Sequence, residues 1–369
     1  MQSSEIDKEQ KKEFRAGFYP TERECPVSNT EDYIAFLNQK TISNLVPIRS
    51  IIELTYRCNF HCIHCYAIQK HDRKDLNTSD FKDIIDQLEN MGSLTMTLSG
   101  GEPLMRNDFF EIAQYARDKR FAIRIFSNGS LIDREKALFI KELKPLSIDI
   151  SLYGASEETY GTITGGRDHF RQTIEGIDRL IEKGIEPFLK FPLMRENYGD
   201  YGSMKRIAGE RGLKFVYDLN MSPKDDGSME PVEHIISDEQ QLECIRQEKS
   251  EISCVHRDPD DSICNAARNN IAISPYGDVF PCIQLRMAAG NCREQLLREI
   301  WYESEEINKV RGIRFKDFKE CISCAVSPYC FICPGISHIE RGSMTAPYTY
   351  ACRNASLRSW ANKTKPGTC

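Results

Sequence analysis

Between residues 50 and 222, strand-like and helical patterns alternate six times along the chain. The strand candidates are short, mostly apolar runs at residues 50–56, 94–98, 122–126, 146–152, 186–193 and 214–219. Runs that are apolar almost throughout are typical of strands covered on both faces. Strands that alternate with amphipathic helices form parallel sheets. This pattern therefore predicts an α/β fold in which helices cover a parallel sheet.

The segments between the strand candidates carry helical periodicity. One of them repeats apolar residues on a single helical face, namely Phe81, Ile84, Ile85, Leu88 and Met91. Thr78 or Ser79 is its expected N-cap, and Gly92 is its expected stop. The segment at residues 170–181 repeats the pattern and is followed by Gly184, so a second helix is expected there.

Three closely spaced cysteines directly follow the first strand candidate. Cys58, Cys62 and Cys65 have the pattern Cys-x3-Cys-x2-Cys. Thiolates packed this tightly can hold three irons of a cubic [4Fe–4S] cluster and leave the fourth iron without a protein ligand. An open metal position serves chemistry rather than stability. By spacing alone, a zinc site that includes His61 or His64, or a group of buried thiols, stays open as well.

A glycine-rich turn, Ser-Gly-Gly-Glu-Pro at residues 99–103, follows the second strand candidate. Glycine lets a backbone approach a ligand closely and adopt a positive φ. Together with the three cysteines, and in this order, the turn resembles the radical S-adenosylmethionine (radical SAM) superfamily. The resemblance implies that the open iron chelates the amino and carboxylate groups of S-adenosylmethionine (SAM). It also implies that Gly100, Gly101 and Glu102 meet the methionine end of SAM.

The resemblance covers the whole alternating stretch and implies an open partial (β/α)6 barrel, similar to a TIM barrel, over residues 48–222. In such barrels, ligands are met at the C-terminal ends of the strands. Asn128 and Ser151 end the third and fourth strand candidates, at positions that match the family's ribose and carboxylate contacts. Both are predicted cofactor residues, although the Asn-Gly and Tyr-Gly pairs beside them are also ordinary turn sequences. Tyr153 stands where many relatives have Asp, so that catalytic Asp is missing from this chain.

A second group of cysteines lies toward the C-terminus. Its members are Cys264, Cys282, Cys321, Cys324, Cys330, Cys333 and Cys352. The first two bracket residues 271–281, which predict a β-hairpin turned at residues 276–278. The next four have the pattern Cys-x2-Cys-x5-Cys-x2-Cys, which suits structural zinc as well as iron–sulfur clusters.

This second group resembles the SPASM extension of radical SAM enzymes, a small domain that binds two auxiliary [4Fe–4S] clusters. The resemblance implies a SPASM domain over residues 263–369, preceded by a polar linker at residues 223–262. The outer cluster would be held by Cys321, Cys324, Cys330 and Cys352. Three irons of the inner cluster would be held by Cys264, Cys282 and Cys333. The family usually has three residues between the cysteines that match Cys330 and Cys333, whereas this chain has two, Phe331 and Ile332.

Two outcomes are open for the fourth iron of the inner cluster. Cys254 lies ten residues before Cys264, in the region where sulfatase maturases place an additional ligand, and is a candidate. Otherwise the iron is open to a substrate thiolate, whose pKa it would lower.

As a whole, the resemblance implies an enzyme that cleaves SAM to methionine and a 5′-deoxyadenosyl radical, which abstracts hydrogen from a substrate C–H bond. The difficult chemistry belongs to the cofactors, while the protein binds, orients and excludes water. Residues 151–154 and 163–166 look most similar to maturases of ribosomal peptide natural products, which form thioether or carbon–carbon cross-links or epimerise residues. The implied partners are a peptide or protein substrate, a reducing partner such as flavodoxin or ferredoxin, and a separate peptide-recognition protein.

Three alternatives remain beside a peptide maturase. An anaerobic sulfatase maturase is disfavoured, because its family places a catalytic Asp directly after the cysteine matching Cys282, where this chain has Ile283. A porphyrin or other small-molecule enzyme stays open, since nothing in the sequence names the substrate. A non-enzymatic iron–sulfur electron carrier would have no use for an open iron beside a glycine-rich turn.

The composition of the chain limits the classes of partner and the cellular compartment that we expect. A net charge of −6 gives no electrostatic case for nucleic acid or an anionic membrane as a partner. The sequence has no apolar run of 18 residues and starts with polar residues, so a cytoplasmic protein is expected. Its 15 cysteines are better explained by metal than by disulfides, because a cytosol keeps thiols reduced. Oxygen-sensitive clusters suggest an anaerobic cell. Residues 1–47 are expected to form an N-terminal cap.

Overall fold

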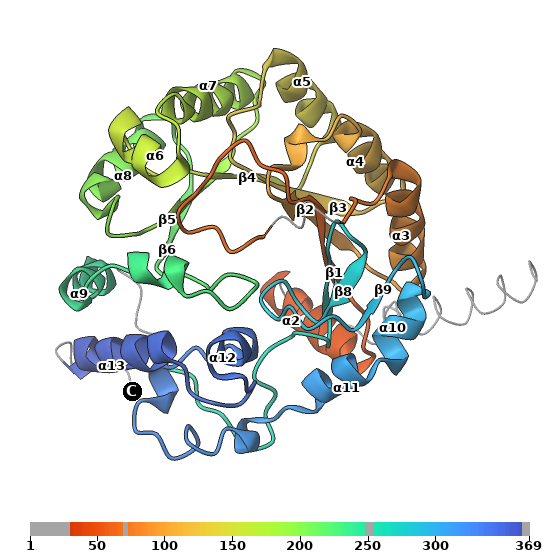
Figure 1. Cartoon of the computed structure of the whole chain (residues 1–369), viewed down its shortest axis with the longest axis vertical. Coiled ribbons are helices and arrows are strands. Elements are labelled where there is room, and N and C mark those ends of the chain that lie inside the picture. The colour runs from red at the N-terminus through yellow and green to blue at the C-terminus, as the bar shows by residue number, and fades with distance from the viewer. Residues whose placement is uncertain (1–29, 69–72, 248–253, 364–369) are drawn as a thin grey trace, which may run out of the picture.

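The computed structural model describes residues 30–68, 73–247 and 254–363 of the chain (Figure 1). All six predicted strands form, and they are β1 (Arg49–Thr55), β2 (Thr95–Gly100), β3 (Ala122–Ser127), β4 (Ser147–Ser151), β5 (Phe188–Pro192) and β6 (Phe215–Asp218). Each pairs in parallel with the next along the chain. The predicted α/β fold with a parallel sheet is confirmed.

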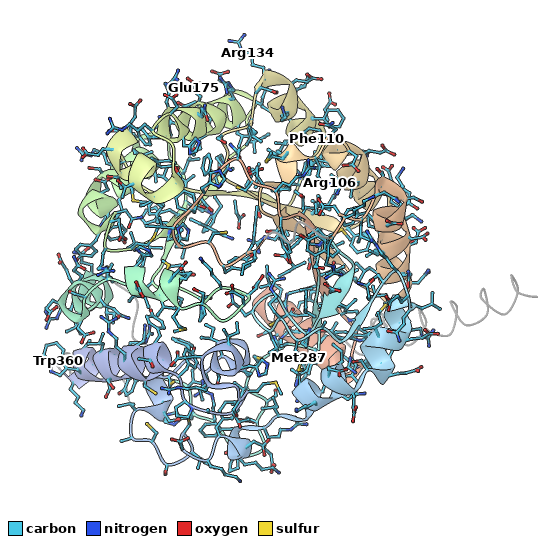
Figure 2. All side chains as sticks on the ribbon, viewed as in Figure 1. Arg106, Phe110, Arg134, Glu175, Met287 and Trp360 are labelled. Atoms are coloured by element: carbon cyan, nitrogen blue, oxygen red, sulfur yellow. The ribbon has the colours of Figure 1, made fainter. Side chains whose placement is uncertain are left out.

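Helices cover the outer face of this sheet (Figure 1). In the barrel region they are α3 (Thr78–Asn90), α4 (Phe109–Asp118), α5 (Arg134–Leu143), α6 (Glu157–Thr164), α7 (His169–Glu182) and α8 (Tyr201–Glu210). Their apolar faces are buried against the strands, while side chains such as Arg134 and Glu175 point outward at the rim (Figure 2). Hydrophobic burial of these faces is the main force that holds the layers together.

Helix α3 confirms the predicted apolar face but corrects its start. Phe81 and Leu88 are fully buried, as the periodicity predicts. The N-cap is Asn77, whose side-chain oxygen accepts a hydrogen bond from the backbone N–H of Asp80 at 3.0 Å. Thr78 is instead the first helical residue. Gly92 follows the helix with a φ of 82°, the left-handed conformation expected of a helix stop.

The sheet continues beyond the six predicted strands. β7 (Asn270–Ile273) pairs in parallel with β1, and β8 (Asp278–Phe280) and β9 (Gly290–Asn291) follow in antiparallel pairing. The hairpin expected at residues 271–281 is thus present, but it joins the barrel sheet rather than a sheet of its own. The strand order is β6-β5-β4-β3-β2-β1-β7-β8-β9, so β6 and β9 are the terminal strands and the barrel is open between them.

The remaining elements surround the barrel or form its C-terminal neighbour. They are α2 (Thr30–Ser43), α9 (Asp238–Gln247), α10 (Leu297–Glu303), α11 (Glu305–Gly312), α12 (Pro334–Arg341) and α13 (Thr349–Lys363). Helix α13 packs against α9, which belongs to the predicted linker (Figure 1). Within the described ranges, no helix has the length and apolarity that a membrane crossing requires.

Candidate active site

The loop after β1 holds the three thiols that the sequence predicts as ligands of the catalytic cluster. Cys58, Cys62 and Cys65 are free thiols. Burial, and after it the negative charges of Cys65 and Cys58, raises the pKa of Cys62 well above its ordinary value. Thiols this close resist joint ionisation unless a cation shares the site, and the irons of a cluster supply that charge. This donor set fits the predicted [4Fe–4S] cluster.

Backbone hydrogen bonds fix this cysteine loop at the C-terminal end of the barrel. The N–H groups of His61 and Ile63 donate to the carbonyls of Thr164 and Ile163, at 2.9 and 3.0 Å. On the other side, the N–H of Glu102 donates to the carbonyl of Arg57 at 2.9 Å. The cysteine loop is therefore clamped between the end of α6 and the glycine-rich turn that follows β2.

The glycines of that turn are required by the chain itself. A Cβ at Gly101 would lie 2.4 Å from the carbonyl oxygen of Arg57 and 2.7 Å from that of Tyr56. Gly100 has a φ of 130°, and a Cβ there would lie 2.2 Å from the carbonyl oxygen of Thr55. The close approach expected from the sequence is present, but its partner is the cysteine loop. Contact of Gly100 and Gly101 with SAM stays a prediction.

Glu102 is fully buried and joins the glycine-rich turn to the end of β3. Its carboxylate accepts hydrogen bonds from the N–H of Asn128 at 2.8 Å, the N–H of Leu104 at 3.1 Å and the hydroxyl of Ser127 at 3.0 Å. Burial raises the pKa of Glu102 to about 7, against the opposing effect of these donors. This carboxylate has a clear positioning role, and its predicted contact with SAM stays a prediction.

Asn128 braces the cysteine loop from the end of β3. Its side-chain N–H donates to Oδ1 of Asn59 at 2.9 Å, and its Oδ1 accepts from the N–H of Ser130 at 2.9 Å. The same side-chain nitrogen lies 4.0 Å from the sulfur of Cys58. The predicted cofactor residue Asn128 is thus beside the predicted ligand Cys58, in a network with Asn59 that sequence reasoning missed. Ser151 is half-buried at the end of β4, and its contact with SAM stays a prediction.

Tyr153 also reaches the cysteine loop. Its hydroxyl lies near the sulfur of Cys62 and, as a donor, lowers the pKa of that thiol against the effect of burial. Its ring lies 5.1 Å, centroid to centroid, from the ring of His64. The sequence indicated only that the usual Asp is missing at this position, and the structure assigns Tyr153 a contact with a predicted ligand.

A buried ion pair joins β1 to the C-terminal part of the chain. Arg286 contacts both carboxylate oxygens of Glu53, at 2.5 and 2.8 Å, and both side chains are nearly or fully buried. The hydroxyl of Tyr56 donates to Glu53 at 2.8 Å, and Asp225 lies 3.3 Å from Arg286. Such bidentate contacts are the strong form of the Arg–carboxylate pair. No local pattern in the sequence pointed to this pair.

The C-terminal cysteines separate into the two groups that the resemblance implies. Burial, then the charges of Cys333 and Cys264, raises the pKa of Cys282 to about 12. Burial, then the charges of Cys352 and Cys321, raises the pKa of Cys330 to about 11. Cys330 therefore lies with the outer group and Cys333 with the inner one, despite the shortened spacing between them. Ligation of iron by these thiols stays a prediction.

Cys254 receives no support as a ligand of the inner cluster. It is disulfide-bonded in the structure. The next residue, Val255, donates its N–H to the carbonyl of Pro328 at 2.8 Å, and Arg257 donates to the carbonyl of Cys330 at 2.8 Å. This part of the chain thus runs beside the outer cysteine group. The assignment of Cys254 to the inner cluster stays a prediction.

Comparison with known families agrees with this arrangement. The family model described as "Radical SAM superfamily" matches residues 52–204, and the SPASM model, described as "Iron-sulfur cluster-binding domain", matches residues 264–325. The first match runs from β1 into α8 and includes the cysteine loop, and the second includes four of the seven cysteines of the second group.

The names of the curated relatives describe several different activities. Fe-coproporphyrin III synthase from Methanosarcina barkeri is 39% identical over 149 residues, which are 40% of this chain and 37% of that protein. AdoMet-dependent heme synthase from the same organism is 28% identical over 315 residues, covering 77% of this chain and 89% of that protein. Mycofactocin maturase MftC from Mycolicibacterium smegmatis is 27% identical over 285 residues, 72% of each protein.

Among solved structures, Streptococcus suis SuiB bound to its precursor peptide SuiA has the same fold. It superposes with a TM-score of 0.67 at 18% identity, over 94% of this chain and 88% of that one. The matched domains imply [4Fe–4S] clusters and SAM as cofactors. The chain belongs to the radical SAM superfamily and carries a C-terminal SPASM iron–sulfur domain.

Proposed function

We propose that this radical SAM enzyme modifies a peptide or protein substrate. Cys58, Cys62 and Cys65 would hold the catalytic cluster, and SAM would bind at its open iron. Together, when bound, cluster and SAM supply reductive cleavage of SAM and abstraction of hydrogen from a substrate C–H bond. The chain's own residues fix the geometry, because Glu102 and Asn128 tie the cysteine loop to the strand ends and leave it little freedom.

The observation that supports a peptide is the open side of the barrel. β6 and β9 are terminal strands of the sheet, so a long substrate can enter laterally between them. Helices α12 and α13 of the C-terminal segment lie beside the barrel on this side, with α9 next to α13 (Figure 1). An enclosed barrel would admit only a small molecule, whereas an open edge also offers unpaired backbone groups to an extended chain. A maturase name among the relatives, MftC, agrees with this proposal.

A porphyrin substrate is the second candidate, and one feature of the barrel favours it. Arg124 and Lys190 both lie 3.0 Å from the carboxylate of Asp149, which is fully buried. Arg124 and Lys190 thereby present two cationic groups that the carboxylate of a ligand could contact, and the charge of Asp218 also acts on Lys190. Two relatives named for coproporphyrin and heme chemistry agree with this alternative.

One experiment tests the catalytic assignment. The enzyme is reconstituted anaerobically with iron and sulfide and then reduced with dithionite in the presence of SAM. We expect methionine and 5′-deoxyadenosine from the wild-type enzyme. Replacing Cys58, Cys62 and Cys65 by Ala should abolish both products and leave roughly eight irons per chain, because two auxiliary clusters would remain. Retained cleavage in the triple variant would exclude these cysteines as the catalytic ligands.

A second experiment separates the two substrate classes. The reduced enzyme is incubated with SAM and either Fe-coproporphyrin III or any short peptide that is encoded beside its gene. A peptide substrate should raise 5′-deoxyadenosine above the substrate-free level and change in mass. Conversion of the porphyrin, with all peptides unchanged, would overturn the proposal in favour of the second candidate.

A further inference from the structure

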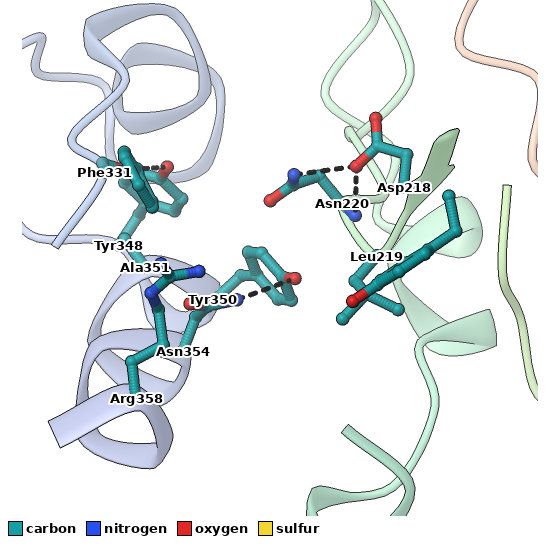
Figure 3. Close-up of a pocket in the computed structure, with 10 residues that line it drawn as sticks. Asp218, Leu219, Asn220, Phe331, Tyr348, Tyr350, Ala351, Asn354 and Arg358 are labelled. Atoms are coloured by element: carbon teal, nitrogen blue, oxygen red, sulfur yellow. Dashed lines mark hydrogen bonds between the residues drawn. The ribbon is translucent and has the colours of Figure 1, made fainter. Parts of the chain in front are cut away.

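A cavity of about 200 Å³ lies between the end of β6 and helix α13 (Figure 3). Residues 217–220 line its barrel side. The opposite side is lined by Phe331, Tyr348 and four residues of α13, namely Tyr350, Ala351, Asn354 and Arg358. None of these residues is a predicted ligand of a cluster or of SAM, so the cavity has no role in the reaction as described above.

Two polar atoms of this cavity are buried without a hydrogen-bond partner among the residues that the structure describes. They are Nε of Arg358 and Oδ1 of Asn354, which are one turn apart on α13. An unmade hydrogen bond at a buried atom costs about 1–3 kcal/mol, so such atoms mark places where a partner is missing. Nε of Arg358 can only donate and Oδ1 of Asn354 can only accept. A ligand that satisfies both must therefore carry an acceptor and a donor side by side.

Two further groups that line the cavity, the hydroxyl of Tyr350 and the carboxylate of Asp218, also offer a donor and an acceptor to a ligand. The hydroxyl of Tyr350 accepts hydrogen bonds from Asn354 at 3.1 Å and from Gln241 at 3.4 Å, which leaves its own proton to donate. Across the cavity, Oδ1 of Asp218 accepts from both the backbone and the side-chain nitrogen of Asn220, each at 2.8 Å, as Figure 3 shows. These bonds hold the Asp218 carboxylate, an acceptor, at the barrel side.

Aromatic side chains form the remaining walls. The guanidinium of Arg358 stacks 4.9 Å above the ring of Phe331, which is half exposed. The hydroxyl of Tyr348 donates a hydrogen bond to the backbone carbonyl of Phe331 at 3.2 Å and fixes the backbone there. Flat aromatic surfaces with a few placed polar groups are typical of a binding pocket.

We propose that this cavity binds an extended segment of the peptide substrate, with one amide bond set between Arg358 and Asn354. An amide carbonyl would accept from Arg358, and an adjacent N–H would donate to Asn354. Since β6 ends at the cavity and is a terminal strand, a peptide laid along its edge would run into this pocket. A porphyrin carboxylate fits less well, because it would face the anionic Asp218 and leave Asn354 unpartnered.

This inference rests on the proposed function, and its test distinguishes failure of the inference from failure of the proposed function. The reconstituted wild-type enzyme is used to select binders from an mRNA-display library of random 12-residue peptides. The dissociation constants of the selected peptides are then measured by fluorescence anisotropy. We expect Arg358→Gln combined with Asn354→Leu to weaken binding roughly tenfold or more, since two buried hydrogen bonds are lost. Arg134→Gln, on the outer side of α5, is the matched control and should bind as the wild type does.

Tyr350→Phe provides a second variant of nearly unchanged shape, which removes one hydroxyl and should weaken the same peptides several-fold. Substrate-free formation of 5′-deoxyadenosine should be equal in all four proteins, because none of these residues belongs to the catalytic site. Selected peptides that bind the cavity variants as tightly as the wild type would overturn this inference and leave the proposed function intact. A wild-type enzyme that selects no peptide at all would count against the proposed function, and this inference would fail with it.

Discussion

Replacing Gly101 by Ala should destabilise the protein before any cofactor is bound. The added Cβ would lie 2.4 Å from the carbonyl oxygen of Arg57, whereas real Cβ contacts stay beyond 3.0 Å. The atoms that the new Cβ would meet belong to the backbone of the cysteine loop, so the clash cannot be relieved by rotating a side chain. The turn and the cysteine loop must separate by at least 0.6 Å, the difference between those two distances.

The expected loss follows from two contributions. Over-packing against rigid structure costs about 1–3 kcal/mol. The separation also stretches two short backbone hydrogen bonds, Gly101 N–H to Thr55 at 2.7 Å and Glu102 N–H to Arg57 at 2.9 Å, which contribute about 1 kcal/mol each. If stretching removes about half of the hydrogen-bond contribution, Gly101→Ala should lower the free energy of unfolding by about 2–4 kcal/mol.

The assay is urea denaturation of the cluster-free protein under anaerobic conditions, followed by circular dichroism. Gly209→Ala in α8 is the matched control, because a Cβ there meets nothing within 4 Å and should stabilise the helix by about 0.5–1 kcal/mol. A Gly101→Ala protein as stable as the wild type, but weak in SAM binding, would refute the reasoning. Gly101 would then be required by the cofactor, as the sequence alone suggested.

Three further predictions concern the groups around the cysteine loop. Burial raises the pKa of Glu102 from its ordinary 4.5 to about 7, so the stability that the protonated carboxyl contributes is complete below pH 4.5 and is lost as the pH rises to 7. The loss in the free energy of unfolding is about 3 kcal/mol. Glu102→Gln should remove this part of the pH dependence of urea denaturation. Arg286→Met leaves the buried charge of Glu53 unpaired and should cost about 3–5 kcal/mol in the same assay, whereas adding Glu53→Leu should recover much of it; equal losses in the single and double variants would contradict a direct pairing. Tyr153→Phe removes the donor to Cys62 and should shift the midpoint potential of the catalytic cluster to more negative values in an EPR-monitored redox titration; an unchanged potential would show that the hydroxyl does not reach the ligand.

The strands and helices of the barrel were predictable because their signals are local. Apolar runs and helical periodicity fix elements such as β3 and α7 within a few residues. The start of α3 was mispredicted, because Asn77 stands next to Thr78 and Ser79 and all three can cap a helix. Only the fold determines which of three adjacent polar residues meets the free N–H groups.

Contacts between distant parts of the chain were not predictable from one sequence. Glu53 and Arg286 are 233 residues apart, and each alone looks like an ordinary charged residue. The pairing of β7 with β1 is equally distant, so the hairpin was expected but its place in the barrel sheet was not. The glycines of residues 100–101 show the same limit, since their pattern indicates a close approach but not what approaches.

The pairing of β7 with β1 has a consequence for how the protein is made. β1 can pair with β2 soon after synthesis, but its other edge stays exposed until β7 emerges more than 200 residues later. An unpaired strand edge is a template for aggregation, and such long-range contacts form slowly. During much of its synthesis, the barrel therefore has an unpaired edge on β1, the strand that leads into its cysteine loop. A barrel shortened to residues 30–262 would keep this edge of β1 unpaired permanently, so it should aggregate rather than behave as an independent domain.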